Sequence, residues 1–401
     1  MTLRTIDTLP LHPGDRVLVR CDFNVPLHDG TIADDRRIRS ALPTLQELRR
    51  RGAIIIACSH LGRPGGRIVP ELSLAPVATR LGELLGVEVP LLELDDAAAP
   101  VATARAGDVL LLENLRFHPE ETSTDADERT RLASRLAALA DAVVSDGFGV
   151  VHRAQASTVE VEQLRPSAAG RLIMAELDAS AKLLQSPATP YTVVLGGAKV
   201  SDKLGVIENL LPRIDRLLIG GGMAYTFLAA LDNPVGASLC ETERFDDCLA
   251  ILRDASANGV QVALPVDVRV AAGLDAQESQ VVAADGIEST DLDAAAMGLD
   301  IGPRTEALFA QLIAGSGTVF WNGPMGVFER PAFVGGTRAV ATALHGCPGY
   351  TVIGGGDSAA AVRALGFSDD DFSHISTGGG ASLELLEGRP LPGLTVLGWS
   401  A

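Results

Sequence analysis

The strongest constraint on the fold is a repeated alternation of short apolar segments with longer amphipathic ones. Segments with helical spacing of apolar residues, such as 37–51 and 74–85, lie between short apolar runs at 16–20, 53–58, 109–112 and 142–144. Strands that alternate with helices are typical of a mostly parallel sheet covered by helices. The alternation starts again with strands expected at 191–195, 216–219, 261–264, 318–321 and 350–353. The sequence therefore predicts an α/β protein with two doubly wound, Rossmann-like lobes.

The length of 401 residues supports two domains, because one hydrophobic core seldom serves so long a chain. A segment with helical spacing covers 168–185 and ends at Ser186-Pro187. We assign 171–186 to a hinge helix, 1–170 to an N-terminal lobe and 187–380 to a C-terminal lobe. The polar, turn-rich segment 275–300 is expected to be a peripheral excursion.

Composition excludes several classes of protein. With 33 basic and 51 acidic residues the net charge is −18, which argues against binding to nucleic acid or to an anionic membrane. The first ten residues have no apolar run of the signal-peptide type, and no apolar stretch is long enough for a membrane span. The five cysteines are scattered and show no CxxC spacing, so we expect free thiols and a cytoplasmic protein.

Arginines follow several strands of the first lobe. Ligands bind at the carboxyl ends of strands in such sheets, so these positions are informative. Arg63, Arg116 and Arg153 each follow a different expected strand, His60 precedes Arg63, and Arg37 begins a helix. Several guanidinium groups at one edge indicate a pocket for a phosphate or carboxylate group.

The run from Asp22 to Asn24, after the first strand, has two interpretations. An acid and an amide at a strand end can orient ligand hydroxyl groups or hold the hydration shell of a cation. The same residue types also favour an ordinary turn. The residues alone leave both open.

Glycines mark the strand ends of the second lobe. The chain has no GxxxxGK[ST] loop, but Gly196-Gly197-Ala198-Lys199 follows a strand, and Lys203 comes four residues later. We expect the two lysines to lie on one face of the following helix. Further glycine clusters occur at 220–222, 354–356 and 378–380, which is typical of backbone that approaches phosphate groups. Asp357 either caps a helix or holds Mg²⁺ beside nucleotide phosphates.

Together these motifs resemble the phosphoglycerate kinase family over essentially the whole chain. The segments that carry the resemblance in the first lobe are VLVRCDFNVP at 17–26, RIRSALPT at 37–44, SHLGRPGG at 59–66, LLLENLRFHPEE at 110–121 and HRAQAST at 152–158. Those in the second lobe are GGAKVSDK at 196–203, IGGGMAYTFL at 219–228, MGLDIGP at 297–303, VFWNGPMGVFE at 319–329, GGGDS at 354–358 and STGGGASLELLEG at 376–388.

The resemblance implies reversible phosphoryl transfer from 1,3-bisphosphoglycerate to ADP, giving 3-phosphoglycerate and ATP. It implies a phosphoglycerate site formed by Asp22, Phe23, Asn24, Arg37, His60, Leu61, Gly62, Arg63, Arg116 and Arg153. It implies a nucleotide site formed by Lys203, Glu329, Gly355, Gly356, Asp357 and Ser358, with Asp357 at Mg²⁺. The groups acting on the transferred phosphoryl would be Arg37, Lys199 and the backbone near Gly356 and Gly380. The final segment, 381–401, would pack back on the first lobe, and the protein would be a monomer.

No general base is expected, because neither the ADP phosphate oxygen nor the carboxylate that accepts the phosphoryl group carries a proton that must leave. Catalysis would depend on in-line positioning upon hinge closure and on charge balance. The alternatives are another kinase of small carboxylates and an inactive, two-lobed binding homologue.

Overall fold

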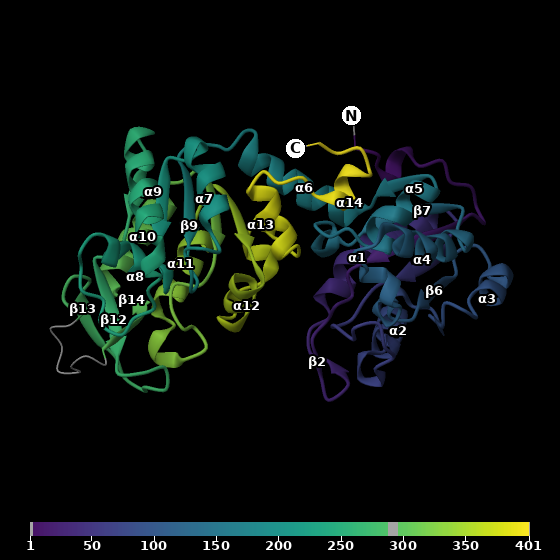
Figure 1. Cartoon of the computed structure of the whole chain (residues 1–401), viewed down its shortest axis with the longest axis horizontal. Helices are drawn as coiled ribbons and strands as arrows, with labels where there is room; N and C mark the ends of the chain where they lie inside the picture. Colours follow the sequence, from purple (N-terminus) through teal and green to yellow (C-terminus); the bar gives the residue numbers. More distant parts are fainter. Residues whose placement is uncertain (1–2, 288–295, 401) are drawn as a thin grey trace. The chain divides into compact units, whose positions relative to one another are not determined.

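The computed structural model describes residues 3–287 and 296–400, which form two compact units (Figure 1). Unit 1 holds the residues up to Asp178 and from Arg389 onward, and unit 2 holds Ala179–Gly388. The division between the units falls inside helix α6 (Arg171–Leu184). The α/β class with two lobes, predicted from the alternation of segments, is confirmed.

Unit 1 is built on a six-stranded sheet in which every pair of neighbours is parallel. Along the sheet the strands are β5 (Leu91–Leu92), β6 (Val109–Leu112), β4 (Ile54–Cys58), β1 (Arg16–Cys21), β7 (Ala142–Asp146) and β8 (Ser167–Ala169). All residues of β4, β6 and β7 are buried, as expected for a sheet covered on both faces.

Helices pack on both faces of this sheet. One apolar cluster joins the sheet to α1 (Arg36–Arg50) and α2 (Ala75–Leu85). The other joins it to α3 (Ala98–Thr103), α4 (Ala126–Ala138) and α5 (Val161–Leu164). A short hairpin of β2 (Leu27–His28) and β3 (Thr31–Ile32) precedes α1.

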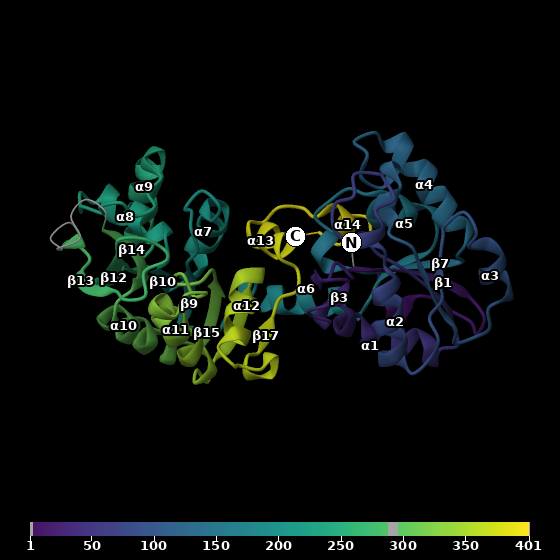
Figure 2. The same cartoon turned by 90° about the horizontal axis from the view of Figure 1, so that it is seen from below.

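The C-terminal segment is part of unit 1. Its helix α14 (Pro392–Thr395) lies beside the N-terminal residues in both views (Figures 1 and 2). The backbone N–H of Arg4 donates to the carbonyl of Leu397, and that of Gly393 donates to the carbonyl of Val151. The side chains of Leu391, Leu394 and Leu397 are fully buried.

Unit 2 repeats the architecture with a parallel six-stranded sheet. The strand order is β11 (Gln261–Ala263), β10 (Arg216–Ile219), β9 (Tyr191–Leu195), β15 (Thr318–Asn322), β16 (Tyr350–Gly354) and β17 (His374–Ile375). One face packs on α7 (Leu204–Leu210), α8 (Met223–Ala230), α9 (Phe245–Ala257) and α13 (Gly380–Leu386). The other packs on α10 (Pro303–Ala314), α11 (Gly335–His345) and α12 (Gly356–Ala364), and Figure 2 shows helices on both sides. No helix among the described residues is long and apolar enough to cross a membrane.

Two expectations about individual segments are wrong. The helix expected over 168–185 begins only at Arg171, because Ser167–Ala169 pair with β7 as a strand. The segment 275–300 is not a mere excursion. It contributes β13 (Gln280–Ala283) and β14 (Met297–Ile301) to an antiparallel sheet with β12 (Asp267–Ala271), while its residues 288–295 lie outside the described part. Polar Asp300 concealed β14 in the sequence, yet it is buried and accepts the backbone N–H of Gly336 at 2.9 Å.

The buried C-terminal leucines predict that this segment stabilises unit 1. Leu394→Ala should lower the free energy of unfolding by about 2–5 kcal/mol, because it removes a fully buried side chain and leaves a cavity. Urea denaturation followed by circular dichroism measures this loss. Leu164→Ala, at a leucine that is 38% exposed in the same unit, is the matched control and should cost far less. Equal losses in the two variants would contradict the prediction.

Candidate active site

Three of the predicted arginines line one cavity of about 410 Å³ in unit 1. They are Arg63, Arg116 and Arg153, and among the described residues no carboxylate lies at ion-pair distance from any of them. Burial, followed by the charges of Arg20 and Arg153, lowers the pKa of Arg116 to about 10. Gathered positive charge without an acidic partner favours the binding of an anion.

Asn114 holds the loops after β4 and β6 together. Its Oδ1 accepts the backbone N–H groups of Leu61 at 3.2 Å and Arg116 at 3.1 Å, and its Nδ2 donates to the carbonyl of Leu61 at 2.8 Å. Arg116 Nη1 donates to the carbonyl of Gly62 at 2.7 Å, and Asn24 Oδ1 accepts the N–H of Gly62 at 2.9 Å. The ends of β1, β4 and β6, which are neighbours in the sheet, are therefore joined by hydrogen bonds.

Asp22 and Arg37 form an ion pair. Asp22 follows β1 and is only 5% exposed, whereas Arg37 lies in the first turn of α1 and is partly exposed. The other carboxylate oxygen of Asp22 accepts the N–H of Asn24 at 3.3 Å. The turn expected for this run is therefore present, and Asp22 also orients an arginine, whereas a role of Asp22 and Asn24 toward ligand hydroxyl groups or a cation stays a prediction.

Two of the predicted site residues have side chains in the hydrophobic core. Phe23 is fully buried and Leu61 is 2% exposed, and both pack in the cluster beneath α1 and α2. The N–H of Phe23 donates to Ser59 Oγ at 2.8 Å. At this edge of the sheet Phe23 and Leu61 therefore act through their backbone groups, and their side chains fix the position of the backbone by packing in the core.

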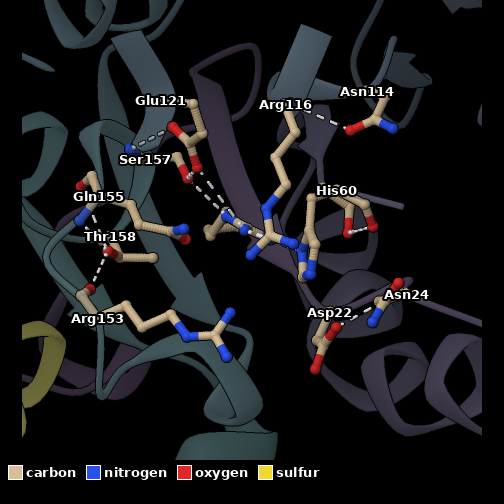
Figure 3. Close-up of polar contacts among 12 residues, drawn as sticks. Asp22, Asn24, His60, Asn114, Arg116, Glu121, Arg153, Gln155, Ser157 and Thr158 are labelled. Atoms are coloured by element: carbon tan, nitrogen blue, oxygen red, sulfur yellow. Dashed lines mark hydrogen bonds and ion pairs between the residues drawn. The ribbon is translucent and has the colours of Figure 1, made fainter. Parts of the chain in front are cut away.

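Sequence reasoning missed the fully buried residues behind the arginine cavity. Arg20, Glu121 and Ser157 are each 0% exposed and contact one another, and Arg20 also contacts His60. Figure 3 shows Glu121 with Ser157, and His60 between Arg116 and Asp22. The one available signal was a charged residue, Arg20, at the end of an apolar strand. Nothing in the sequence connects it with Glu121.

In unit 2 a cavity of about 360 Å³ lies where glycine-rich loops follow the strands. Its lining combines two carboxylates, Glu329 and Asp357, with glycine backbone and apolar side chains: Gly197, Ala198, Gly221, Gly222, Ala237, Leu239, Leu274, Met297, Gly298, Leu299, Pro324, Gly326 and Val327. An apolar lining with a few polar groups is typical of a small-molecule site.

Two glycine-rich loops approach each other too closely for side chains. A Cβ on Gly323 would lie 2.2 Å from the carbonyl oxygen of Gly196, and Gly323 has a φ of +95°. The N–H of Gly196 donates to the carbonyl of Asn322 at 2.9 Å. These two glycines therefore serve loop packing. Gly356, in contrast, has nothing within 4 Å of the position of a Cβ and leaves open backbone at the start of α12.

The prediction that Lys199 and Lys203 share a face of a helix is wrong. Helix α7 begins at Leu204, so both lysines precede it. Lys203 Nζ donates to Asn322 Oδ1, and burial lowers the pKa of Lys203. Lys199 is exposed.

Glu241, far away in sequence, holds the turn between the lysines. Its carboxylate accepts the N–H of Val200 at 2.6 Å and the hydroxyl of Ser201 at 2.6 Å. Burial alone would raise the pKa of Glu241, but these hydrogen bonds outweigh it and the pKa is lowered. No local signal in the sequence pointed to this residue.

Asp357 lies in the first turn of α12, and Gly355, with a φ of +86°, occupies the N-cap position. Asp357 therefore does not cap the helix by its side chain, and it lines the cavity instead. Ser358 is buried, and its Oγ accepts the N–H of Gly323 at 2.6 Å. Gly380 is the first residue of α13.

An arginine-lined anion cavity on one α/β unit and a glycine-rich cavity with carboxylates on another define a kinase of small metabolites. The phosphoglycerate kinase family model matches residues 7–389, and the chain belongs to this family. Curated relatives include the phosphoglycerate kinases of Clavibacter michiganensis, 58% identical over all of both chains, and Bifidobacterium longum, 56% identical over 98% of this chain and all of the relative.

Solved structures agree. The phosphoglycerate kinase of Coxiella burnetii is 40% identical, with a TM-score of 0.87 over 99% of both chains. That of Pyrococcus horikoshii is 31% identical, with a TM-score of 0.84 over 99% of this chain and 98% of the other. The protein is thus a phosphotransferase with a carboxyl acceptor, and it transfers a phosphoryl group reversibly between 1,3-bisphosphoglycerate and ADP.

Proposed function

We propose that the arginine cavity of unit 1 binds the phosphate of 3-phosphoglycerate or 1,3-bisphosphoglycerate and that the cavity of unit 2 binds ADP or ATP. The observation that carries the proposal is the set of three guanidinium groups, Arg63, Arg116 and Arg153, without acidic partners among the described residues. Guanidinium groups bind phosphate oxygens with paired hydrogen bonds. Asp22, Asn24, Arg37, His60 and Gly62 lie along the same edge of the sheet and would contact the glycerate.

Arg153→Gln tests this assignment. Loss of one charged hydrogen bond, worth about 1.5–3 kcal/mol, should weaken binding of 3-phosphoglycerate about ten- to a hundredfold. Isothermal titration calorimetry with 3-phosphoglycerate measures the change. Arg67→Gln, at an exposed arginine outside the cavity, makes the same charge change and should bind normally. Equal affinity in the two variants would remove Arg153 from the site.

In the proposed mechanism an oxygen of the ADP β-phosphate attacks the phosphorus of the acyl phosphate in line. The bond from phosphorus to the carboxyl oxygen breaks as the new bond forms, and no proton changes place. Arg37, Lys199 and the backbone N–H groups near Gly356 and Gly380 would balance the charge on the transferred group. Lys203 and Ser358 would support the nucleotide loops through Asn322 and Gly323.

Mg²⁺ fits the unit 2 cavity as a partner of the nucleotide. The described residues contain no cluster of three or more metal-ligating side chains, and the cavity offers Asp357 and Glu329. Mg²⁺ commonly binds through one or two carboxylates together with nucleotide phosphates and water. When bound, the ion would neutralise phosphate charge, and Asp357 would hold it.

The two ligands must meet for the reaction to occur. We assign this step to hinge closure about residues 171–186, which would also exclude water from the transferred group. That the protein works as a monomer in the cytoplasm stays a prediction.

Arg37→Ala should lower turnover about a thousandfold or more, because Arg37 would stabilise charge that develops in the transition state. A coupled assay with 3-phosphoglycerate and MgATP, read through glyceraldehyde-3-phosphate dehydrogenase and loss of NADH, measures it. Arg36→Ala removes a neighbouring arginine that pairs with Asp34, and this control should retain activity. A folded Arg37→Ala protein with normal turnover would refute the catalytic assignment.

Lys199→Arg should lower turnover about a hundredfold while leaving the KM for MgATP nearly unchanged. A planar guanidinium group replaces a compact ammonium group poorly where charge must meet a phosphoryl group. Lys182→Arg is the matched control, because Lys182 lies 4.4 Å from the centre of the Tyr350 ring and arginine can make the same contact. Full activity of Lys199→Arg in the coupled assay would show that any cation suffices there.

A further inference from the structure

Arg20, Glu121 and Ser157, which are buried behind the arginine cavity, take no direct part in the proposed phosphoryl transfer. We propose that Arg20, held by Glu121 and Ser157, is a positioning residue that fixes His60 as a neutral imidazole with its proton on Nε2, a hydrogen-bond donor to the bound phosphoglycerate. This inference rests on the proposed function, which places His60 against the substrate.

The hydrogen bonds of Arg20 determine the tautomer. Arg20 Nη2 lies 3.3 Å from His60 Nδ1, its Nε donates to Ser157 Oγ at 2.7 Å, and its Nη1 donates to the carbonyl of Cys21. A guanidinium group has donors only, so His60 Nδ1 must be the acceptor. A neutral imidazole that accepts at Nδ1 carries its proton on Nε2.

Glu121 and Ser157 hold Arg20 in this position. Ser157 Oγ donates to Glu121 Oε1 at 2.6 Å, and the N–H of Ser157 donates to Oε2 at 3.1 Å. The hydroxyl proton is therefore directed at Glu121, which leaves the oxygen to accept from Arg20. Glu121 Oε1 is also 3.9 Å from Arg20 Nη2, and it compensates a charge that is fully buried.

The surroundings of His60 disfavour the imidazolium form. His60 is 3% exposed, and its pKa lies well below the ordinary value because of burial first and then the charges of Arg20, Arg116, Arg37 and Arg153. Asp22 lies beside it as well, but that carboxylate is paired with Arg37. A neutral Nε2–H adds a donor at the site without adding another positive charge to the arginines.

The tautomer can be measured without substrate. Nitrogen-15 chemical shifts of labelled histidine in the full-length protein distinguish an N–H nitrogen from an acceptor nitrogen, and His60→Gln assigns the signals. We expect His60 to be neutral near neutral pH, with its proton on Nε2. A proton on Nδ1, or a charged imidazolium, would overturn the proposal whatever the variants do.

Two variants test the support. Ser157→Ala should bring in the second tautomer of His60 and raise the KM for 3-phosphoglycerate about three- to tenfold, with kcat much less affected. Glu121→Gln should do the same, whereas Glu120→Gln, in the same short helix (Pro119–Thr122), is the matched control and should change neither quantity.

An unchanged tautomer in a folded Ser157→Ala protein would mean that the cluster is only structural. If the buried variants do not fold, the nitrogen-15 measurement on the unmodified protein still decides whether His60 is neutral with its proton on Nε2. The proposed function has a separate test: normal binding of 3-phosphoglycerate by Arg153→Gln would contradict it without bearing on the tautomer of His60.

Discussion

Mutual repulsion among guanidinium groups is the constraint on which unit 1 depends. Arg20, Arg37, Arg63, Arg116 and Arg153 gather near the carboxyl ends of one parallel sheet. Each would be more stable if it were apart from the others or paired with an acid. The fold compensates two of them: Asp22 pairs with Arg37, and Glu121 lies beside Arg20. The other three line the cavity without an acidic partner among the described residues, and that remaining charge is the basis of the proposed anion site.

The sheet topology makes this arrangement possible. Neighbouring parallel strands end at one edge, so residues far apart in sequence meet there without a long connection. Asn114 joins two strand ends, and the Asn24–Gly62 hydrogen bond joins a third. These amides carry no charge, so they hold the loops without neutralising the arginines. Carboxylates in the same places could accept the same N–H groups, but they could not donate to the carbonyl of Leu61 as Asn114 Nδ2 does, and their charge would neutralise the arginines.

The sequence predicts what depends on local pattern. Alternating apolar runs revealed both parallel sheets, and arginines after strands predicted that Arg63, Arg116 and Arg153 lie together, as they do in one cavity. The sequence could not predict contacts made by distant residues. Glu241 holds the turn at Ser201, and that turn displaces Lys199 and Lys203 from the helix in which their spacing placed them. Asp300 made the buried strand β14 look like a loop, because a polar residue usually indicates exposure. Its hydrogen-bond donor, the backbone N–H of Gly336, lies in α11 and could not be foreseen from the local sequence. The Arg20–Glu121–Ser157 cluster escaped detection for the same reason.

The two units use cations differently, and the chemistry explains why. The proposed phosphoglycerate site must hold a phosphate that does not react, so planar guanidinium forks, of which that of Arg116 is bonded to the carbonyl of Gly62, suit it. The proposed nucleotide side must follow charge that moves between donor and acceptor during transfer. Lys199 is exposed and lies on a turn, so its side chain can adjust to that charge. The backbone at Gly356, in the same unit, is also open. The chain has thirty arginines and only three lysines, and two of the lysines, Lys199 and Lys203, lie in this turn. Lys203 is held by Asn322, so we propose that Lys199 alone supplies the adjustable ammonium group there.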